Sequence, residues 1–147
     1  MAAATGPGTL FTLLYGVFAV GATSRSVVQW LTKASHAPLA YALSSLAACV
    51  YVAGFLLLLR WGHPGSRRAM RVLCQVELTG VVVIGTLSVL RPDLFPDATV
   101  WSTYGLGYLL LPAILPVMVL RWLRRTEAAA SSATTTTSTA PPRTPER

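Results

Sequence analysis

The chain has 147 residues, of which 53% are hydrophobic and only 12% are charged. Soluble domains carry about 25% charged residues, so this composition excludes an ordinary water-soluble domain and indicates a membrane protein. The formal net charge is +7. Because the chain has no room for a separate water-exposed basic domain, a nucleic-acid partner is not expected.

Four long apolar runs follow one another along the chain, and each carries one tryptophan near an end. They cover residues 9–30, 38–59, 70–90 and 103–122, with Trp30, Trp61, Trp101 and Trp122. Each run is close to the ~20 residues that a helix needs to cross a bilayer, and tryptophan favours the headgroup interface. Backbone groups in lipid must be satisfied within their own segment, so helices are expected. The short connections predict an all-α fold, an integral membrane four-helix up-down bundle over residues 9–125.

The first run leaves an alternative open. Its apolar stretch 10–20 is followed by Gly21 and Ala22, as in a cleavable signal peptide. A signal peptide also needs a basic start, and residues 1–8 contain neither Lys nor Arg. We therefore expect 1–8 to be a short N-terminal segment that precedes an uncleaved first span.

Basic residues are distributed unequally between the two sides of the predicted bundle. One side holds both termini and the connection between the second and third spans, and the other holds only Arg25, Lys33 and Arg91. The basic residues on the first side are Arg60, Arg67, Arg68, Arg71, Arg121, Arg124, Arg125, Arg143 and Arg147. The positive-inside rule then places both termini in the cytoplasm. We expect these cytoplasmic arginines to attract the anionic headgroups of the lipid bilayer.

Two charged residues interrupt the apolar spans. Glu77 lies roughly 10 Å inside the third span, where a charge is costly unless it pairs, is neutralised or faces the bundle interior. Measured from the other side, Arg25 is about 12 Å deep and Glu77 about 20 Å, a gap that two long side chains can cross. Gln29 follows Arg25 by one helical turn.

Helical spacing predicts a polar seam made of Arg25, Gln29 and Glu77. Faces of the second and third spans are expected to converge on it, and they carry Tyr41, Ser44, Ala48 and Tyr51, and Glu77, Val81, Gly85 and Ser88. The seam is either a proton or substrate path, or a structural ion pair that fixes the helix register. A third alternative is that Arg25 and Glu77 extend to opposite interfaces.

The connection before the fourth span reads RPDLFPDATVWSTYG. Two prolines stiffen it, and its candidate contact residues are Asp93, Asp97 and Trp101, with Trp101 expected at the interface. The aspartates suit a turn or a cap on the fourth helix, or weak binding of a cation.

Motifs of catalysis or metal binding are missing from the sequence, which has no CxxC, HExxH, GxSxG or P-loop. Cys49 and Cys74 lie in different spans, where small packing roles are expected. His36 and His63 belong to opposite connections and cannot share a metal. We therefore expect no enzyme activity, no cofactor and no metal.

The tail 126–147 contains the run AAASSATTTTSTAPPRTPER. Small, polar and proline residues cannot bury enough surface to offset the entropy of ordering, so a disordered cytoplasmic tail is predicted. Whether it is passive or carries a docking or phosphorylation segment stays open.

The segments SRSVVQW, APLAYALSSL and LFPDATVWSTYGLGY resemble small four-span integral membrane proteins of high-GC actinobacteria. The resemblance covers residues 10–125 and implies a place in the bacterial cytoplasmic membrane, but that family brings no established activity.

Two functions fit these features. The first is a non-enzymatic accessory or assembly partner that binds another membrane protein or a second copy of the chain. The second is a small oligomeric transporter or channel subunit that uses Arg25 and Glu77, since four short helices enclose too little space for a path through one protomer. Small multidrug exporters have this length, but their membrane glutamate lies in the first span, so membership is not expected.

Overall fold

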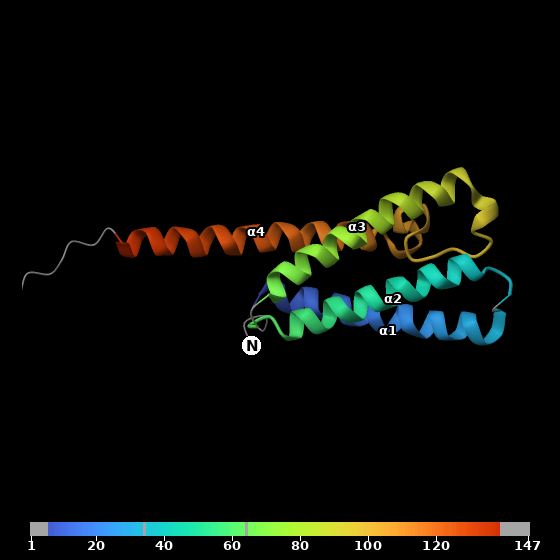
Figure 1. The fold of residues 1–147 in the computed structure, drawn as a ribbon, viewed down its shortest axis with the longest axis horizontal. Coiled ribbons are helices and arrows are strands. Elements are labelled where there is room, and N and C mark those ends of the chain that lie inside the picture. Colours follow the sequence, from blue (N-terminus) through green and yellow to red (C-terminus); the bar gives the residue numbers. More distant parts are fainter. Residues whose placement is uncertain (1–5, 34, 64, 139–147) are drawn as a thin grey trace, which may run out of the picture.

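A computed structural model of the chain describes residues 6–33, 35–63 and 65–138. Its long helices are α1 (Pro7–Lys33), α2 (Pro38–Leu59), α3 (Ser66–Leu90) and α4 (Leu111–Ser138), joined by the short 3₁₀ helices η2 (Pro92–Leu94) and η3 (Ser102–Tyr108). The described residues contain no strand, and the predicted all-α four-helix bundle is confirmed (Figure 1).

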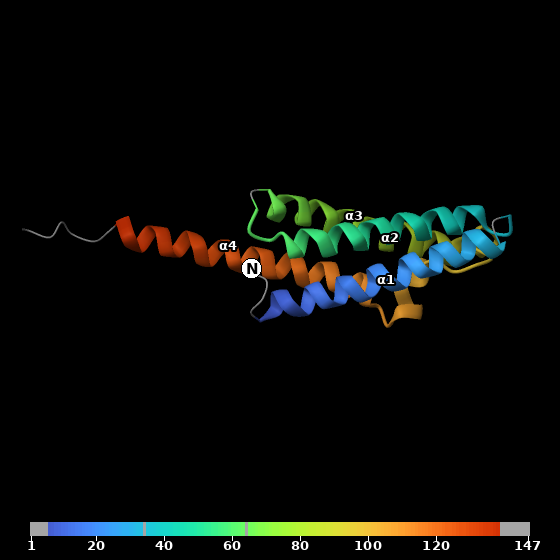
Figure 2. The same ribbon diagram turned by 90° about the horizontal axis from the view of Figure 1, so that it is seen from below.

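The helices run alternately up and down the bundle. The start of α1, the α2–α3 turn and the C-terminal part of α4 lie at one end, which we call the arginine end because it carries Arg60, Arg67, Arg68 and Arg71 (Figures 1 and 2). The α1–α2 turn and the α3–α4 connection, residues 91–110, lie at the opposite end, which we call the loop end. Helix α1 packs along α2, and α3 packs along α4.

The buried and exposed faces of the helices identify a multi-pass membrane protein. The inward face of α1 repeats every three or four residues as Phe11, Tyr15, Ala19, Ala22, Ser26 and Gln29. Its outward face is also apolar, with Leu13, Val17 and Val20 more than 60% exposed. Helices α1, α2 and α3 are each long and apolar enough to cross a membrane. A fourth crossing requires η3 and α4 to act as one broken span.

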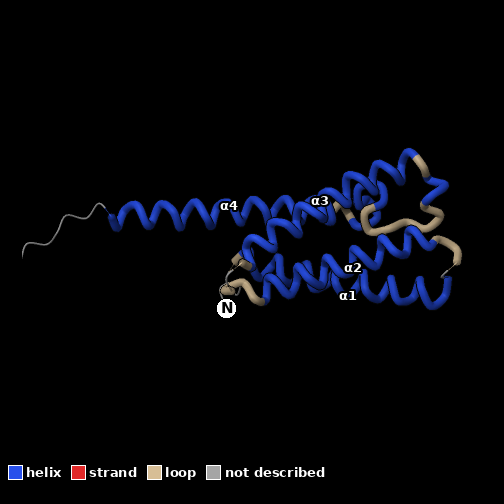
Figure 3. The backbone as a smooth tube through the Cα atoms, viewed as in Figure 1, coloured by secondary structure: helices blue, strands red, loops and turns tan. Residues whose placement is uncertain are grey.

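The predicted continuous fourth span, residues 103–122, is wrong at its start. The helix η3 is bent by 93° from α4, which begins only at Leu111. The break falls where Leu109 and Leu110 both take left-handed backbone angles, with φ of 57° and 59°. Pro112 then enters the first turn of α4, where its missing N–H costs no hydrogen bond. Figure 3 shows how much of the connection before α4 is not regular helix.

The predicted disorder of the tail does not hold for residues 126–138. Helix α4 continues through them to Ser138, beyond the arginine end of the bundle (Figure 1). Alanine is the best helix former, and adding residues to an existing helix avoids the cost of nucleation, so Ala128, Ala129 and Ala130 extend α4 without packing against the bundle. The remainder of the predicted tail, 139–147, lies outside the described residues, as do Met1 to Thr5.

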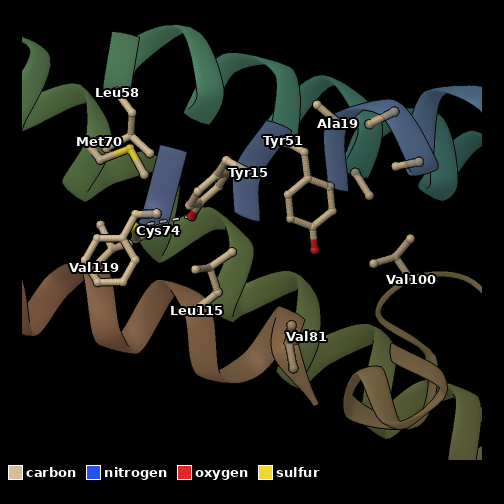
Figure 4. Close-up of a cluster of buried hydrophobic side chains, with 14 of the residues drawn as sticks. Tyr15, Ala19, Tyr51, Leu58, Met70, Cys74, Val81, Val100, Leu115 and Val119 are labelled. Carbon is tan, nitrogen blue, oxygen red and sulfur yellow. Dashed lines mark hydrogen bonds between the residues drawn. The ribbon is translucent and has the colours of Figure 1, made fainter. Parts of the chain in front are cut away.

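The core at the arginine end is apolar and aromatic. Trp61 and Trp122 stack with their ring centroids 4.6 Å apart. Between them and the bundle centre, Leu58, Met70, Cys74 and Val119 are fully buried (Figure 4). Close packing of these side chains stabilises the helix contacts inside this end of the bundle.

Candidate functional site

Glu77 lies near the middle of α3, about 16 Å by helical rise from Ser66 and about 20 Å from Leu90. Its side chain is 0% exposed. The hydroxyl of Tyr15, from α1, donates a 2.7 Å hydrogen bond to Glu77 Oε2. Tyr15 reaches this place because Gly54 of α2 leaves room for its ring: a Cβ on Gly54 would lie 2.5 Å from Tyr15 Cδ1. Glu77 is therefore held in the bundle interior.

Two more aromatic residues, Tyr51 and Trp101, extend this group of buried side chains. Tyr51, from α2, is fully buried, and its hydroxyl lies close to both the Glu77 carboxyl and the Trp101 indole. Figure 4 shows Tyr15 and Tyr51 pointing inward from their helices to the same side of the core. We call Tyr15, Tyr51, Glu77 and Trp101 the Glu77 cluster.

Three polar atoms of the Glu77 cluster make no hydrogen bond with the described residues. They are Glu77 Oε1, the Tyr51 hydroxyl and Trp101 Nε1, and all three are buried. Leaving a buried polar atom without a hydrogen bond costs free energy of folding, so each such atom in a native protein calls for an explanation, often a functional one. The cluster therefore contains one unpaired acceptor oxygen and two unpaired donors. Its hydrogen bonds can be arranged in more than one way.

Trp101 reaches the cluster because the α3–α4 connection dips into the bundle. Its ring lies over α3 where a Cβ on Gly80 would come within 2.9 Å of the indole. A Cβ on Gly85 would lie 2.8 Å from the backbone nitrogen of Tyr104, so the connection's main chain also rests on α3. Gly80 is about 15 Å by helical rise from the end of α3 at Leu90. The predicted interfacial position of Trp101 is therefore wrong, since its side chain is only 2% exposed.

The dipping segment satisfies much of its own backbone. Thr99 and Ser102 are buried, and the backbone N–H of each donates to the other's hydroxyl, at 2.8 and 3.0 Å. The N–H of Thr103 donates to Ser88 Oγ of α3 at 2.8 Å. Irregular backbone at membrane depth is tolerated only when it is buried in protein or lines a cavity. This connection meets that condition because it turns back into the bundle, and we call residues 91–110 the re-entrant loop for this shape.

Arg25 does not pair with Glu77, and the predicted ion pair is wrong. The guanidinium of Arg25 donates instead to the Tyr108 hydroxyl at 2.8 Å and to the Ala98 carbonyl at 2.6 Å. Within the described ranges, the ion pairs are Arg71–Glu127 and Arg91–Asp93. The re-entrant loop supplies acceptors closer to Arg25 than the carboxylate deeper in the bundle. The sequence could not show this, because it does not reveal that the loop folds inward.

The remaining seam and loop residues lie at the loop end. Gln29 is 8% exposed, and its Oε1 has no hydrogen-bond donor among the described residues. Asp97 accepts a 2.6 Å hydrogen bond from the Tyr41 hydroxyl of α2. Arg91 donates twice to Asp93, and this contact lowers the pKa of the Asp93 carboxyl. Neither aspartate caps α4, which begins far along the chain, and the described part contains no cluster of His, Cys, Asp and Glu able to hold a metal ion.

Sequence spacing identified part of this site. The predicted inward faces of the second and third spans are confirmed, since Tyr41, Ser44, Tyr51, Glu77 and Val81 are all buried. The first span was assigned the wrong functional residue. Tyr15, which bonds Glu77, follows Phe11 and precedes Ala19 by four residues, and this repeat could have identified it.

Comparisons with protein-family models, with curated proteins and with solved structures found no match to this chain.

Proposed function

We propose that this chain is a non-enzymatic protein of the bacterial cytoplasmic membrane that binds and releases a proton at Glu77, as the subunit of a small oligomeric transporter. The excess of arginines at one end supports placing both termini in the cytoplasm. The loop end, with the re-entrant connection, would then face outward.

The observation that carries this proposal is the unpaired carboxylate oxygen of Glu77 beside two unpaired donors. As an anion, Glu77 can accept hydrogen bonds from Tyr15 and Tyr51, while the Trp101 N–H can donate to the Tyr51 hydroxyl oxygen. As a neutral acid, it keeps the bond from Tyr15 and can donate its own proton to the Tyr51 hydroxyl oxygen. Both protonation states thus have hydrogen-bond partners, which is what reversible proton binding inside a membrane requires.

Polar side chains, most of them buried, lie on the loop-end side of this site. Above the Glu77 cluster lie Ser44, Ser26, Gln29 and the Arg25–Tyr108 pair. Below it, Cys74, Met70 and Leu58 form an apolar seal toward the arginine end. A proton can therefore arrive from the loop end, whereas release to the other side requires the α1–α2 pair to move relative to the α3–α4 pair.

Proton entry into vesicles tests the proposal. Purified protein is reconstituted with an entrapped pH-sensitive dye, and an inside-negative potassium diffusion potential is imposed. We expect acidification faster than in empty vesicles, and Glu77→Gln should reduce it to the empty-vesicle rate. Glu127→Gln removes a carboxylate at the arginine end and should leave the rate unchanged. Equal rates for wild-type protein and Glu77→Gln would contradict the proposal.

A second candidate is the accessory or assembly partner. It is favoured by the part of α4 after residue 125, which projects past the bundle as a helix (Figures 1 and 2) and whose side chains at 128–132 are exposed. If this projection binds another membrane protein, chemical crosslinking in native membranes should trap one stoichiometric partner. Ending the chain after Arg125 should abolish that crosslink, and its survival would contradict a role for the projection.

A further inference from the structure

A basic pocket of about 660 Å³ lies at the arginine end, between the α2–α3 turn and α4. Its charged lining consists of Arg67, Arg68 and Arg71, with Glu127 as the one carboxylate. Arg71 pairs with Glu127, and Arg67 lies over the Trp61 ring, 5.8 Å from its centroid. Arg68 has no acidic partner in the described part of the chain. The pocket therefore keeps an excess of positive charge.

An apolar groove of about 660 Å³ runs along the lipid-facing side between α2 and α3. Ala53 and Leu57 line it from α2, and Ala69, Val72 and Val76 line it from α3. Gly65 and Arg68 line both the groove and the basic pocket, so the two are continuous at these residues. The stacked Trp61 and Trp122 place this junction at the level of the lipid headgroups.

A positive pocket at the interface that opens into an apolar groove within the membrane matches one kind of molecule. A phospholipid has an anionic phosphodiester next to its acyl chains, and arginine is well suited to bind phosphate oxygens. We propose that an anionic phospholipid binds here, with its phosphate at Arg67 and Arg68 and one acyl chain in the α2–α3 groove. This proposal is independent of proton binding at Glu77.

A second groove gives an internal comparison. It measures about 490 Å³, lies between α1 and α2, and is lined by residues such as Val27, Ala48 and Val52. As the structure describes it, no charged residue lines this groove. Lipid tails will cover both grooves in a bilayer, but only the α2–α3 groove ends at arginines. Charge complementarity thus separates a specific lipid site from ordinary lipid contact.

Lipid binding to the purified full chain in detergent tests the proposal, with native mass spectrometry as the readout. The probes are dioleoyl phosphatidylglycerol, dioleoyl phosphatidylcholine and inorganic phosphate. We expect phosphatidylglycerol to bind one molecule per chain and more tightly than phosphatidylcholine. Each basic group near an anionic surface contributes about a fivefold effect, so Arg67→Gln with Arg68→Gln should weaken binding roughly 25-fold.

Matched variants separate the site from general attraction. Arg124→Gln with Arg125→Gln removes the same charge from the exposed side of α4 and should change affinity by less than about twofold, because an exposed charge outside the pocket is screened. Val72→Phe and Ala69→Phe narrow the α2–α3 groove and should weaken binding, whereas Val27→Phe in the other groove should not.

Three results would overturn the proposal. Equal losses in the two arginine double variants would mean that charge acts without a site. Equal binding of phosphatidylcholine would remove the headgroup requirement. Binding of inorganic phosphate as tight as that of phosphatidylglycerol, with no effect of Val72→Phe or Ala69→Phe, would assign the pocket to free phosphate instead.

Discussion

The two ends of the bundle are held together by different means. At the arginine end, apolar side chains such as Leu58, Met70 and Val119 fill the space between helices. At the loop end, a re-entrant connection fills it. Arg25 and Tyr41 donate hydrogen bonds to that connection, and its Thr103 N–H donates to Ser88 of α3. Packing alone makes a seal, whereas a polar, loop-filled end can rearrange. The difference indicates which side of the membrane reaches Glu77.

Replacing Trp101 should cause the largest loss of stability at the loop end. Its side chain is 2% exposed, and replacing a buried tryptophan by alanine costs about 3 kcal/mol or more, since the cavity does not collapse fully. Trp101→Ala should therefore lower the free energy of unfolding in detergent by that amount. Trp30→Ala is the matched control, because Trp30 is 43% exposed, and it should cost less than about 1 kcal/mol. Similar losses would show that the connection does not insert.

Arg25 should have the next largest effect. Hydrogen bonds from charged groups contribute about 1.5 to 3 kcal/mol, and Arg25→Gln weakens the two that hold the loop at Ala98 and Tyr108. We expect a loss of about 2 kcal/mol and faster proteolysis within residues 91–110. Arg25→Lys should recover only part of the stability, because an ammonium lacks the forked guanidinium that bridges both acceptors. Full recovery would mean that charge, and not geometry, positions the loop.

Double-mutant cycles measure which residues Glu77 interacts with. Tyr15→Phe removes the donor and Glu77→Leu removes the acceptor of one hydrogen bond, so their double-mutant cycle should give a coupling of about 1 kcal/mol. Arg25→Gln and Glu77→Gln share no hydrogen bond, and their effects should add within about 0.5 kcal/mol. A large coupling energy in the second cycle would mean that Arg25 and Glu77 interact directly, as the sequence predicted.

Asp93 should have the smallest effect. The neighbouring Arg91 lowers the pKa of Asp93, so the ion pair stabilises the folded state above the unfolded pKa of Asp93 and loses that contribution as the pH falls through the folded value. Both side chains are exposed, which keeps the effect small. Asp93→Asn should lower the melting temperature slightly near pH 7, with the difference vanishing only once the pH falls below the lowered pKa of Asp93. A difference that grows in acid would contradict this sign.

Sequence periodicity predicted which segments are helical better than it predicted where each helix begins and ends. The second span agrees with α2 at both limits, because Pro38 suits the first turn of a helix and fixes where it begins. The start of the fourth span could not be predicted, because apolar composition does not distinguish a straight helix from a loop that enters the bundle. The structure reveals the difference through Gly80 and Gly85, whose missing side chains seat Trp101 and Tyr104 on α3.

The sequence identified Glu77 as a site residue but not its hydrogen-bond partner, for a related reason. A carboxylate in an apolar span is visible in any sequence, and Glu77 was identified from its position alone. Its partners depend on which helices touch, and charge complementarity favoured Arg25 over Tyr15. The guanidinium of Arg25 found backbone and phenol oxygens of the re-entrant loop instead. Long-range contacts made by irregular backbone leave no periodic signal.

The most direct test of the account is the side from which Glu77 exchanges its proton. The protein is reconstituted in sealed vesicles of known orientation, and the infrared band of the protonated Glu77 carboxyl, identified by its loss in Glu77→Gln, is followed after a pH jump on one side. The account predicts a rapid response to the pH at the loop end and a slow one to the pH at the arginine end. A faster response from the arginine end would contradict it.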